Sequence, residues 1–139
     1  MVGDEMVSGE MVGTEQRAHV TGIRTVAVPV RDQDRALAFW TGPLGMEVRL
    51  DAALGSGRWI EVAPAGAATT IALTAADAGS VPGGDTGIRL TTGDAGAAHS
   101  ALTAAGVDTD PDVLRWPGVP PMFVLRDPDG NRLTVVEQP

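Results

Sequence analysis

The most constraining feature of the sequence is a pattern that occurs twice, about sixty residues apart. Asp32 and Asp94, 62 positions apart, each precede a run of apolar residues at helical spacing. Gly45 and Gly106, 61 positions apart, follow those runs. Aspartate is a favoured helix N-cap and glycine a common helix terminator. The pattern predicts an internal duplication, in which each copy opens with a strand, a helix and a second strand.

Short β-branched and apolar runs predict the remaining elements of each copy. The first copy is expected to hold strands at 22–30, 46–51, 58–63 and 68–74, with a helix that begins after Asp32. The second is expected to hold strands at 86–92, 112–116, 121–126 and 131–137, with a helix after Asp94. The predicted fold class is α+β. It consists of two βαβββ modules, at about 20–78 and 85–138, whose helices pack outside mixed sheets.

The first fifteen residues form a five-residue repeat, MVGDE, MVSGE and MVGTE. A period of five matches neither a helix nor a strand, and residues 1–16 contain four acids and no base. We expect residues 1–18 to be a disordered acidic tail in front of a single domain at 19–139. The sequence has neither a basic leader region nor a long apolar run, so neither a signal peptide nor a membrane span is expected.

Composition excludes several kinds of chemistry. The chain has no cysteine, and all ten basic residues are arginines, so disulfides, thiolate nucleophiles and lysine Schiff bases are impossible. The formal net charge is -8, which argues against a nucleic-acid partner and favours a cationic or neutral small ligand. Many Ala, Gly and Arg residues and the absence of lysine are typical of a GC-rich bacterial genome.

Four short segments carry a resemblance to a known family. They are Val28-Pro29-Val30-Arg31-Asp32, Phe39-Trp40, Leu44-Gly45-Met46 and Asp127-Pro128-Asp129-Gly130-Asn131, the last followed by RLTVVE. Together with the duplication, they resemble the vicinal oxygen chelate superfamily, which includes glyoxalase I, extradiol dioxygenases, fosfomycin-inactivating enzymes and bleomycin-resistance proteins. The resemblance spans roughly 20–139 and implies that the two modules form curved sheets around a concave pocket. The DPDG segment itself is expected to be a tight turn.

Members of this family that use a metal place His, Glu or Gln ligands on four inward strand positions. The resemblance assigns these positions to Thr25, Ala72, Gly87 and Thr134, none of which is a histidine or a carboxylate. His19 and His99 lie outside these strands and are expected to be surface or boundary residues. We therefore expect no metal and no other cofactor.

Strand alternation predicts which residues face the concave pocket. The expected lining consists of Thr25, Trp59, Glu61, Ala72, Arg89, Met122 and Thr134, with Trp116 over the mouth of the pocket. The same alternation assigns Arg24, Val26, Val28 and Val30 to the helix side. Glu61 and Arg89 are the charged groups of the predicted lining. They are expected either to contact a ligand, or to pair with each other or point to solvent at the sheet edge.

Within the resemblance, the absence of metal ligands and the acidic balance favour a metal-independent protein of the bleomycin-resistance type that binds an antibiotic or metabolite. An alternative is a metal-independent isomerase, cyclase or lyase acting on a natural product. In that case Glu61 would be the general base and Arg89 the electrostatic stabiliser. A third is an accessory subunit that uses the groove for a protein partner. The resemblance also implies a homodimer, with ligands held where two chains meet. We expect a cytoplasmic location, without nucleic-acid or membrane partners.

Overall fold

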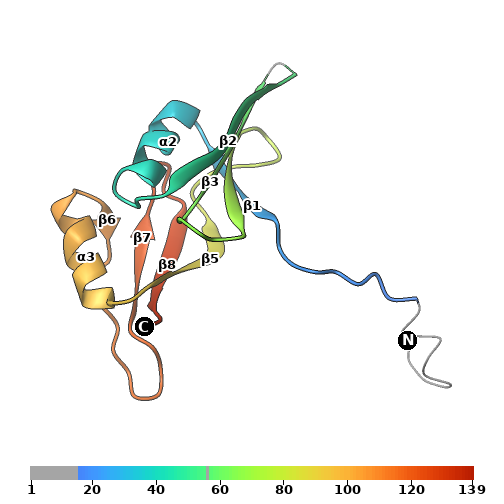
Figure 1. Ribbon diagram of the computed structural model, residues 1–139. Coiled ribbons are helices and arrows are strands. Elements are labelled where there is room, and N and C mark those ends of the chain that lie inside the picture. Colours follow the sequence, from blue (N-terminus) through green and yellow to red (C-terminus); the bar gives the residue numbers. More distant parts are fainter. Residues whose placement is uncertain (1–15, 56) are drawn as a thin grey trace.

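The computed structural model describes residues 16–55 and 57–139 (Figure 1). Most of the expected acidic tail lies outside the described residues. Residues 16–18, its last three, are exposed. The two described helices, of nine and ten residues, are too short and not apolar enough to cross a membrane.

The first module contains β1 (Thr25–Val30), α2 (Gln33–Thr41), β2 (Glu47–Leu54), β3 (Gly57–Ala63) and β4 (Thr70–Ala75). Its sheet has the strand order β1-β4-β3-β2. The β1–β4 pair is parallel, and the β3–β4 and β2–β3 pairs are antiparallel. The parallel pair requires a crossover, which α2 and the β2–β3 hairpin provide.

The second module contains β5 (Asp85–Thr92), α3 (Ala95–Ala104), β6 (Asp108–Thr109), β7 (Met122–Arg126) and β8 (Arg132–Glu137). Its strand order, β5-β8-β7-β6, is the same arrangement, again with one parallel pair, β5–β8. Figure 1 shows the second module beside the first. The predicted duplication of a βαβββ unit with mixed sheets is therefore confirmed.

Both helices begin as the sequence predicts. The Asp32 side chain accepts a hydrogen bond from the Arg35 backbone N–H at 3.1 Å, and the Asp94 side chain accepts one from that of Ala97 at 3.0 Å. Each aspartate has extended backbone angles, as an N-cap residue requires. At the end of α3, Gly106 has a φ of 81°, the left-handed conformation that stops a helix.

The strand expected at 112–116 is wrong. The structure instead has the two-residue strand β6 at Asp108–Thr109, followed by a loop that meets β7 through one bridge between Leu114 and Met122. The physical reason is proline. Pro111, Pro117, Pro120 and Pro121 flank the segment, and a proline has no N–H with which to continue a ladder.

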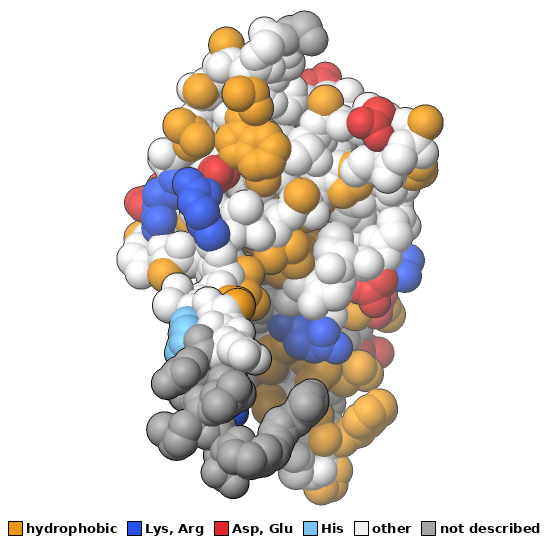
Figure 2. Space-filling view, turned by 90° about the vertical axis from the view of Figure 1, so that its right-hand side faces the viewer, with side chains coloured by type: hydrophobic (Ala, Val, Ile, Leu, Met, Phe, Trp, Pro, Cys, Tyr) orange, Lys and Arg blue, Asp and Glu red, His pale blue; other side chains and the backbone are white. Residues whose placement is uncertain are grey.

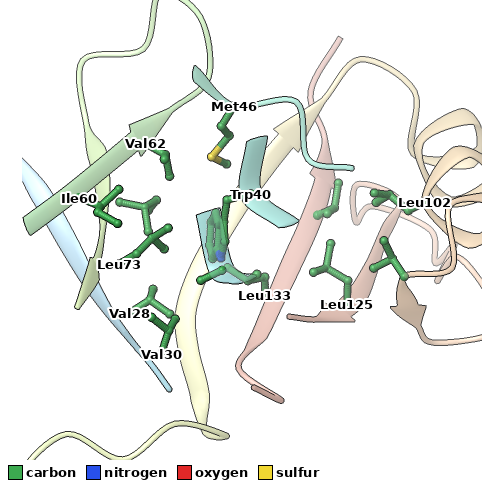
Figure 3. Packing of buried hydrophobic residues seen from close by; sticks show 14 of the residues in the cluster. Val28, Val30, Trp40, Met46, Ile60, Val62, Leu73, Leu102, Leu125 and Leu133 are labelled. Carbon is green, nitrogen blue, oxygen red and sulfur yellow. The ribbon is translucent and has the colours of Figure 1, made fainter. Parts of the chain in front are cut away.

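One hydrophobic core extends through both modules on the helix-facing sides of the sheets. Trp40 of α2 is fully buried and lies between strands of the two modules (Figure 3). Val28 and Val30, which strand alternation assigned to the helix side, belong to this core. The other strand residues of the core are Ile60, Val62, Ile71, Leu73, Phe123, Leu125, Leu133 and Val135, and all of them are buried. The opposite faces of the sheets hold the residues predicted to line the pocket, of which Glu61 and Ala72 are also buried.

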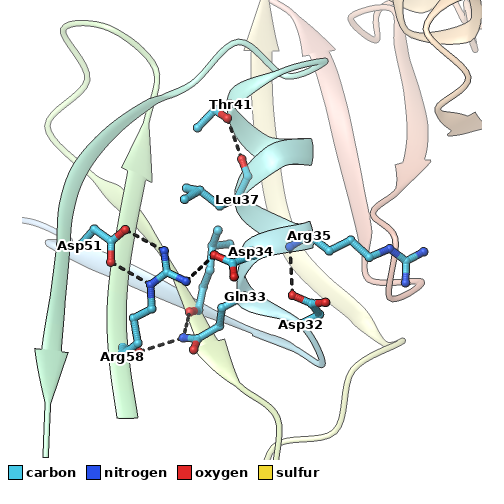
Figure 4. A network of polar contacts seen from close by, with 9 residues as sticks. Asp32, Gln33, Asp34, Arg35, Leu37, Thr41, Asp51 and Arg58 are labelled. Atoms are coloured by element: carbon cyan, nitrogen blue, oxygen red, sulfur yellow. Dashed lines mark hydrogen bonds and ion pairs between the residues drawn. The ribbon is translucent and has the colours of Figure 1, made fainter.

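A polar network holds the β2–β3 hairpin against α2 (Figure 4). Arg58 donates two hydrogen bonds to Asp51, at 2.8 and 2.9 Å, and one to Asp34 of α2 at 2.6 Å. The Arg58 hydrogen bond keeps the pKa of the Asp51 carboxyl below its usual value. Since neighbouring strand residues point to opposite faces, anchoring Arg58 on the helix side directs the next residue, Trp59, toward the other face.

Candidate ligand-binding face

The inward face of the first sheet brings together five of the residues around which the site is built. In the β1–β4 ladder Thr25 lies opposite Thr70, and in the β3–β4 ladder Glu61 lies opposite Ala72. Trp59 is two residues before Glu61 on β3 and therefore shares its face. Directly opposed residues in a sheet are in contact distance. We call this set, Thr25, Trp59, Glu61, Thr70 and Ala72, the first-sheet face.

Glu61 is the polar centre of the first-sheet face. Its side chain is only 4% exposed, and both carboxylate oxygens accept hydrogen bonds from other side chains. Trp59 Nε1 donates to Oε2 at 2.7 Å, and Thr70 Oγ1 donates to Oε1 at 2.8 Å. Arg24 Nη1 lies 3.3 Å from Oε1 and 3.2 Å from Oε2. A carboxylate has about four acceptor positions, and these four contacts occupy them.

These contacts lower the pKa of Glu61 below its ordinary value. The largest cause is the hydrogen bond from Trp59, followed by that from Thr70, and Arg24 adds its hydrogen bond and its charge. Burial acts in the opposite direction but is outweighed. A general base that works near neutral pH needs a raised pKa. Glu61 is therefore better suited to be a fixed anion than a proton acceptor.

Arg24 is placed differently from the prediction. Alternation assigned it to the helix side, but its guanidinium reaches Glu61 on the inward face, and its side chain is 75% exposed. The reason is that Arg24 precedes the first ladder residue, Thr25, so the alternation of β1 does not govern it. Its backbone carbonyl accepts a hydrogen bond from the backbone N–H of Thr70. The ionic partner of Glu61 is thus Arg24, a site residue that sequence reasoning missed.

The second sheet carries three more of the residues that were predicted to line the pocket, Arg89, Met122 and Thr134. Thr134 of β8 lies between Arg89 of β5 and Val124 of β7, while Met122 of β7 lies opposite Val136. The Arg89 side chain is exposed, and its one hydrogen bond within the described chain is to the carbonyl oxygen of Gly87 at 3.4 Å. We call Arg89, Met122, Val124 and Thr134 the second-sheet face.

Gly87 lies where the β5–β8 register shifts, and its φ is 72°. A side chain at this position would be strained, because L-residues rarely adopt a left-handed conformation. The sequence resemblance assigns one of the expected metal-ligand positions to Gly87. The local backbone therefore favours glycine there over any ligating residue.

The two faces lie on separate sheets, and all polar partners of Glu61 belong to the first module. A cavity of about 370 Å³ reaches Arg89, but its other walls include Ile23, Met46 and Ile88. Two other cavities, of about 310 and 250 Å³, are lined by other parts of the chain. None of these three cavities touches Trp59, Glu61 or Met122. One cavity lined by both faces stays a prediction.

The remaining candidates lie apart from Glu61. Trp116 is 63% exposed in the loop between β6 and β7. His99 of α3 donates from Nε2 to the Asp110 carbonyl oxygen at 2.7 Å and lies edge-on to Phe123, so its role is structural. Within residues 16–55 and 57–139, no three His, Asp or Glu side chains are grouped so that they could hold a metal ion.

Figure 2 shows a face of the molecule on which arginine side chains lie next to hydrophobic ones, around a hollow. Apolar surface beside a few polar groups is typical of small-molecule sites. The two sheet faces, together with Arg24 beside the first of them, thus provide aromatic and aliphatic surface, a saturated carboxylate and the exposed guanidinium groups of Arg24 and Arg89.

Comparisons with known proteins agree with this fold. TnmS3, an antibiotic binding protein from Streptomyces sp. CB03234, superposes with a TM-score of 0.80 at 29% identity, over 88% of this chain and all of that one. A superfamily member from Sphaerobacter thermophilus DSM 20745 superposes with a TM-score of 0.80 at 33% identity, over 86% of this chain and 98% of that one.

A curated relative is the uncharacterized protein YetH of Bacillus subtilis (strain 168). It is 44% identical over 52 residues, which is 37% of this chain and 43% of the relative, so the match spans less than half of either protein. The model of the Glyoxalase/Bleomycin resistance protein/Dioxygenase superfamily matches residues 22–135, which covers both modules. The chain therefore belongs to the glyoxalase/bleomycin resistance protein/dioxygenase superfamily.

Proposed function

We propose that this protein binds a small molecule, an antibiotic or a metabolite, without a metal ion. The observation that supports this most is the arrangement of Trp59 and Glu61. The Trp59 indole N–H is hydrogen-bonded to a buried carboxylate, which fixes the orientation of the ring before a ligand arrives. A fixed aromatic surface lowers the entropic cost of binding a planar ligand. The similarity to TnmS3, an antibiotic binding protein, supports the same role.

The lowered pKa of Glu61 favours binding over base catalysis. Trp59 and Thr70 donate hydrogen bonds that stabilise the ionised carboxylate, so its tendency to accept a proton from a substrate falls. The isomerase, cyclase or lyase alternative requires the opposite tuning. We therefore assign Glu61 a structural role within the binding face.

We further propose that two copies of the chain form the complete pocket. On the first-sheet face Thr25 and Trp59 are half-buried, whereas Glu61, Thr70 and Ala72 are buried, and the exposed side chains of Arg89 and Trp116 belong to the second module. In a homodimer, Arg89, Trp116, Met122 and Thr134 of one copy would face Thr25 and Trp59 of the other. In the cytoplasm of a bacterium, such a protein would lower the free concentration of an antibiotic.

A thermal-shift screen of antibiotics and metabolites tests the proposal, because a ligand that binds only the native state raises Tm. A compound that raises Tm should bind Trp59→Ala roughly tenfold or more weakly than wild type. This is the loss expected when an aromatic stacking contact and the area that it buries are removed. Val48→Ala, at an exposed apolar position on β2, is the matched control and should leave affinity unchanged.

Two outcomes would contradict the proposal. One is equal loss of affinity in Trp59→Ala and Val48→Ala. The other is turnover of a bound compound that falls by ~10²–10⁴ in Glu61→Gln while affinity stays the same, which would instead favour the enzyme alternative. Light scattering with and without ligand separately measures whether the chain is a dimer.

A further inference from the structure

The exposed guanidinium of Arg24, which lies beside the first-sheet face, is the group best placed to meet a ligand there. Glu61, by contrast, is 4% exposed and has its acceptor positions filled by Trp59, Thr70 and Arg24. A cationic ligand would gain no hydrogen bond from this carboxylate unless it displaced one of these donors. The surroundings of Glu61 therefore do not favour the cationic ligand that the net charge suggests.

Only one of the three guanidinium nitrogens of Arg24 donates to Glu61. Its Nη1 is directed to Glu61, while Nε and Nη2 have no partner among the contacts of the described residues. A guanidinium presents five N–H donors in a planar fork that matches a carboxylate or another flat anion. Glu61 holds one end of this fork in place, and the side chain is otherwise 75% exposed.

Arg24 and Trp59 are neighbours because both donate to Oε2 of Glu61, at 3.2 and 2.7 Å. An aromatic ring and a guanidinium side by side can take one ligand that has a flat apolar body and an acidic or oxygen-rich substituent. The chain is strongly acidic as a whole, with a formal charge of -8. An anionic group can bind on this face only where donors such as those of Arg24 are directed to it.

We propose that Arg24 is a ligand-binding residue that selects planar aromatic compounds bearing a carboxylate or a similar anionic group, with Glu61 as the residue that positions it. This inference rests on the proposed binding function and names the ligand class for it. It replaces the cationic ligand expected from net charge by one that can accept hydrogen bonds from Nε and Nη2 of Arg24.

Three probes of the same shape test the charge preference at pH 7: 2-naphthoate, which is anionic, 2-naphthalenemethanol, which is neutral, and 2-naphthylmethylammonium, which is cationic. The indole N–H signals in a ¹⁵N NMR titration report binding, and loss of one signal in Trp59→Phe identifies that of Trp59. We expect 2-naphthoate to shift this signal with a Kd roughly tenfold lower than that of the neutral probe, the scale of a charge-assisted hydrogen bond.

Variants of Arg24 separate its role from general electrostatics. Arg24→Gln should remove the preference for 2-naphthoate and leave the affinity for 2-naphthalenemethanol unchanged. Arg24→Lys should keep part of the preference, because it retains the charge but not the planar fork. Arg35→Gln, at an exposed arginine on α2, removes the same charge elsewhere and should keep the full preference. Tm without probe checks that each variant is folded.

The outcomes distinguish the two proposals. If the neutral or cationic probe binds as well as 2-naphthoate, or if Arg24→Gln keeps the preference, the inference about Arg24 is wrong while the binding function stands. If none of the three probes shifts the Trp59 signal, and the screen of antibiotics and metabolites also yields no ligand, the binding function fails and the inference fails with it.

Discussion

Asn131 Nδ2 donates a hydrogen bond to the Pro29 carbonyl oxygen at 2.9 Å and thereby joins two residues 102 positions apart. Pro29 lies on β1 of the first module, and Asn131 lies in the turn between β7 and β8 of the second. Asn131 is 2% exposed, and its Oδ1 accepts from the Gly83 N–H in the connection between the modules. One amide therefore bonds to both modules and to the segment between them.

Replacing Asn131 by alanine should destabilise the protein by about 2–4 kcal/mol. The change removes the hydrogen bonds to the carbonyl of half-buried Pro29 and to the N–H of exposed Gly83, and each lost hydrogen bond costs roughly 0.5–1.5 kcal/mol. Asp127, whose Oδ2 accepts from Asn131 at 2.9 Å, also loses a bond. Urea denaturation measures the change. Arg132→Gln, at the neighbouring exposed position, should change stability by less than about 0.5 kcal/mol.

A comparable loss in Arg132→Gln would contradict this assignment, since the effect would then belong to the turn and strand in general.

The role of Asn131 also bears on the DPDG motif. The sequence predicts a tight turn there, and Asp127 Oδ1 indeed accepts from the backbone N–H groups of Asp129 and Asn131. The long-range bond to Pro29 has no local signal in the sequence.

The two N-caps should contribute equally, because the duplication places the same residue in the same geometry. Asp32→Ala and Asp94→Ala should each destabilise the protein by about 1 kcal/mol, the usual value for such a cap. The two sites share no hydrogen-bond partner, so the double variant should lose about the sum. Thermal or urea denaturation measures these changes. Asp32→Ser and Asp94→Ser keep an acceptor, so they should restore most of the stability.

Much of the fold follows from local signals along the chain. Aspartate caps, helical spacing and alternating strands are encoded within a few residues, so both modules and the buried face were predictable. The failures have local reasons too. Prolines around 112–116 prevent a continuous ladder, and Arg24 lies one residue outside the first pair of its sheet, where alternation gives no information.

The candidate site was harder to predict because it depends on contacts between distant residues. Trp59 and Glu61 were predictable as a pair on one face, since they are two positions apart on one strand. The donation from Thr70 and the approach of Arg24 to Glu61 depend on how β4 and β1 pair with each other and with β3. No pattern within a single strand indicates these partners, and so Glu61 was expected to meet a ligand or Arg89.

Purified protein should contain no stoichiometric transition metal, and EDTA should not change ligand affinity. The positions that the sequence resemblance assigns to the family's metal ligands are Thr25, Ala72, Gly87 and Thr134, which offer no imidazole or carboxylate. Thr25 Oγ1 is moreover engaged with the Thr70 carbonyl oxygen at 3.2 Å. Elemental analysis of untagged protein measures the metal content. About one zinc, nickel or iron per chain would overturn this prediction and the metal-free function with it.

The contribution of Glu61 to stability should depend on pH in a defined direction. Its pKa in the folded protein is lowered from the ordinary value of 4.5, chiefly by the Trp59 hydrogen bond and then by Thr70 and Arg24. A lowered folded-state pKa means that ionised Glu61 stabilises the protein above 4.5. This stabilisation is lost as the pH falls below that value and through the folded-state pKa.

The measurement compares wild type with Glu61→Gln, which keeps the shape of the side chain and removes its titration. Free energies of unfolding from urea curves at pH 7, 5, 4 and 3 give the difference between the two proteins at each pH. Wild type should be the more stable at pH 7, and the difference should shrink as the pH falls below 4.5, because protonated Glu61 no longer accepts from Trp59, Thr70 and Arg24 as an anion. A difference that stays constant from pH 7 to pH 3 would show that the donors around Glu61 do not stabilise its charge. The assignment of Glu61 as the anion that positions Arg24 would then be wrong.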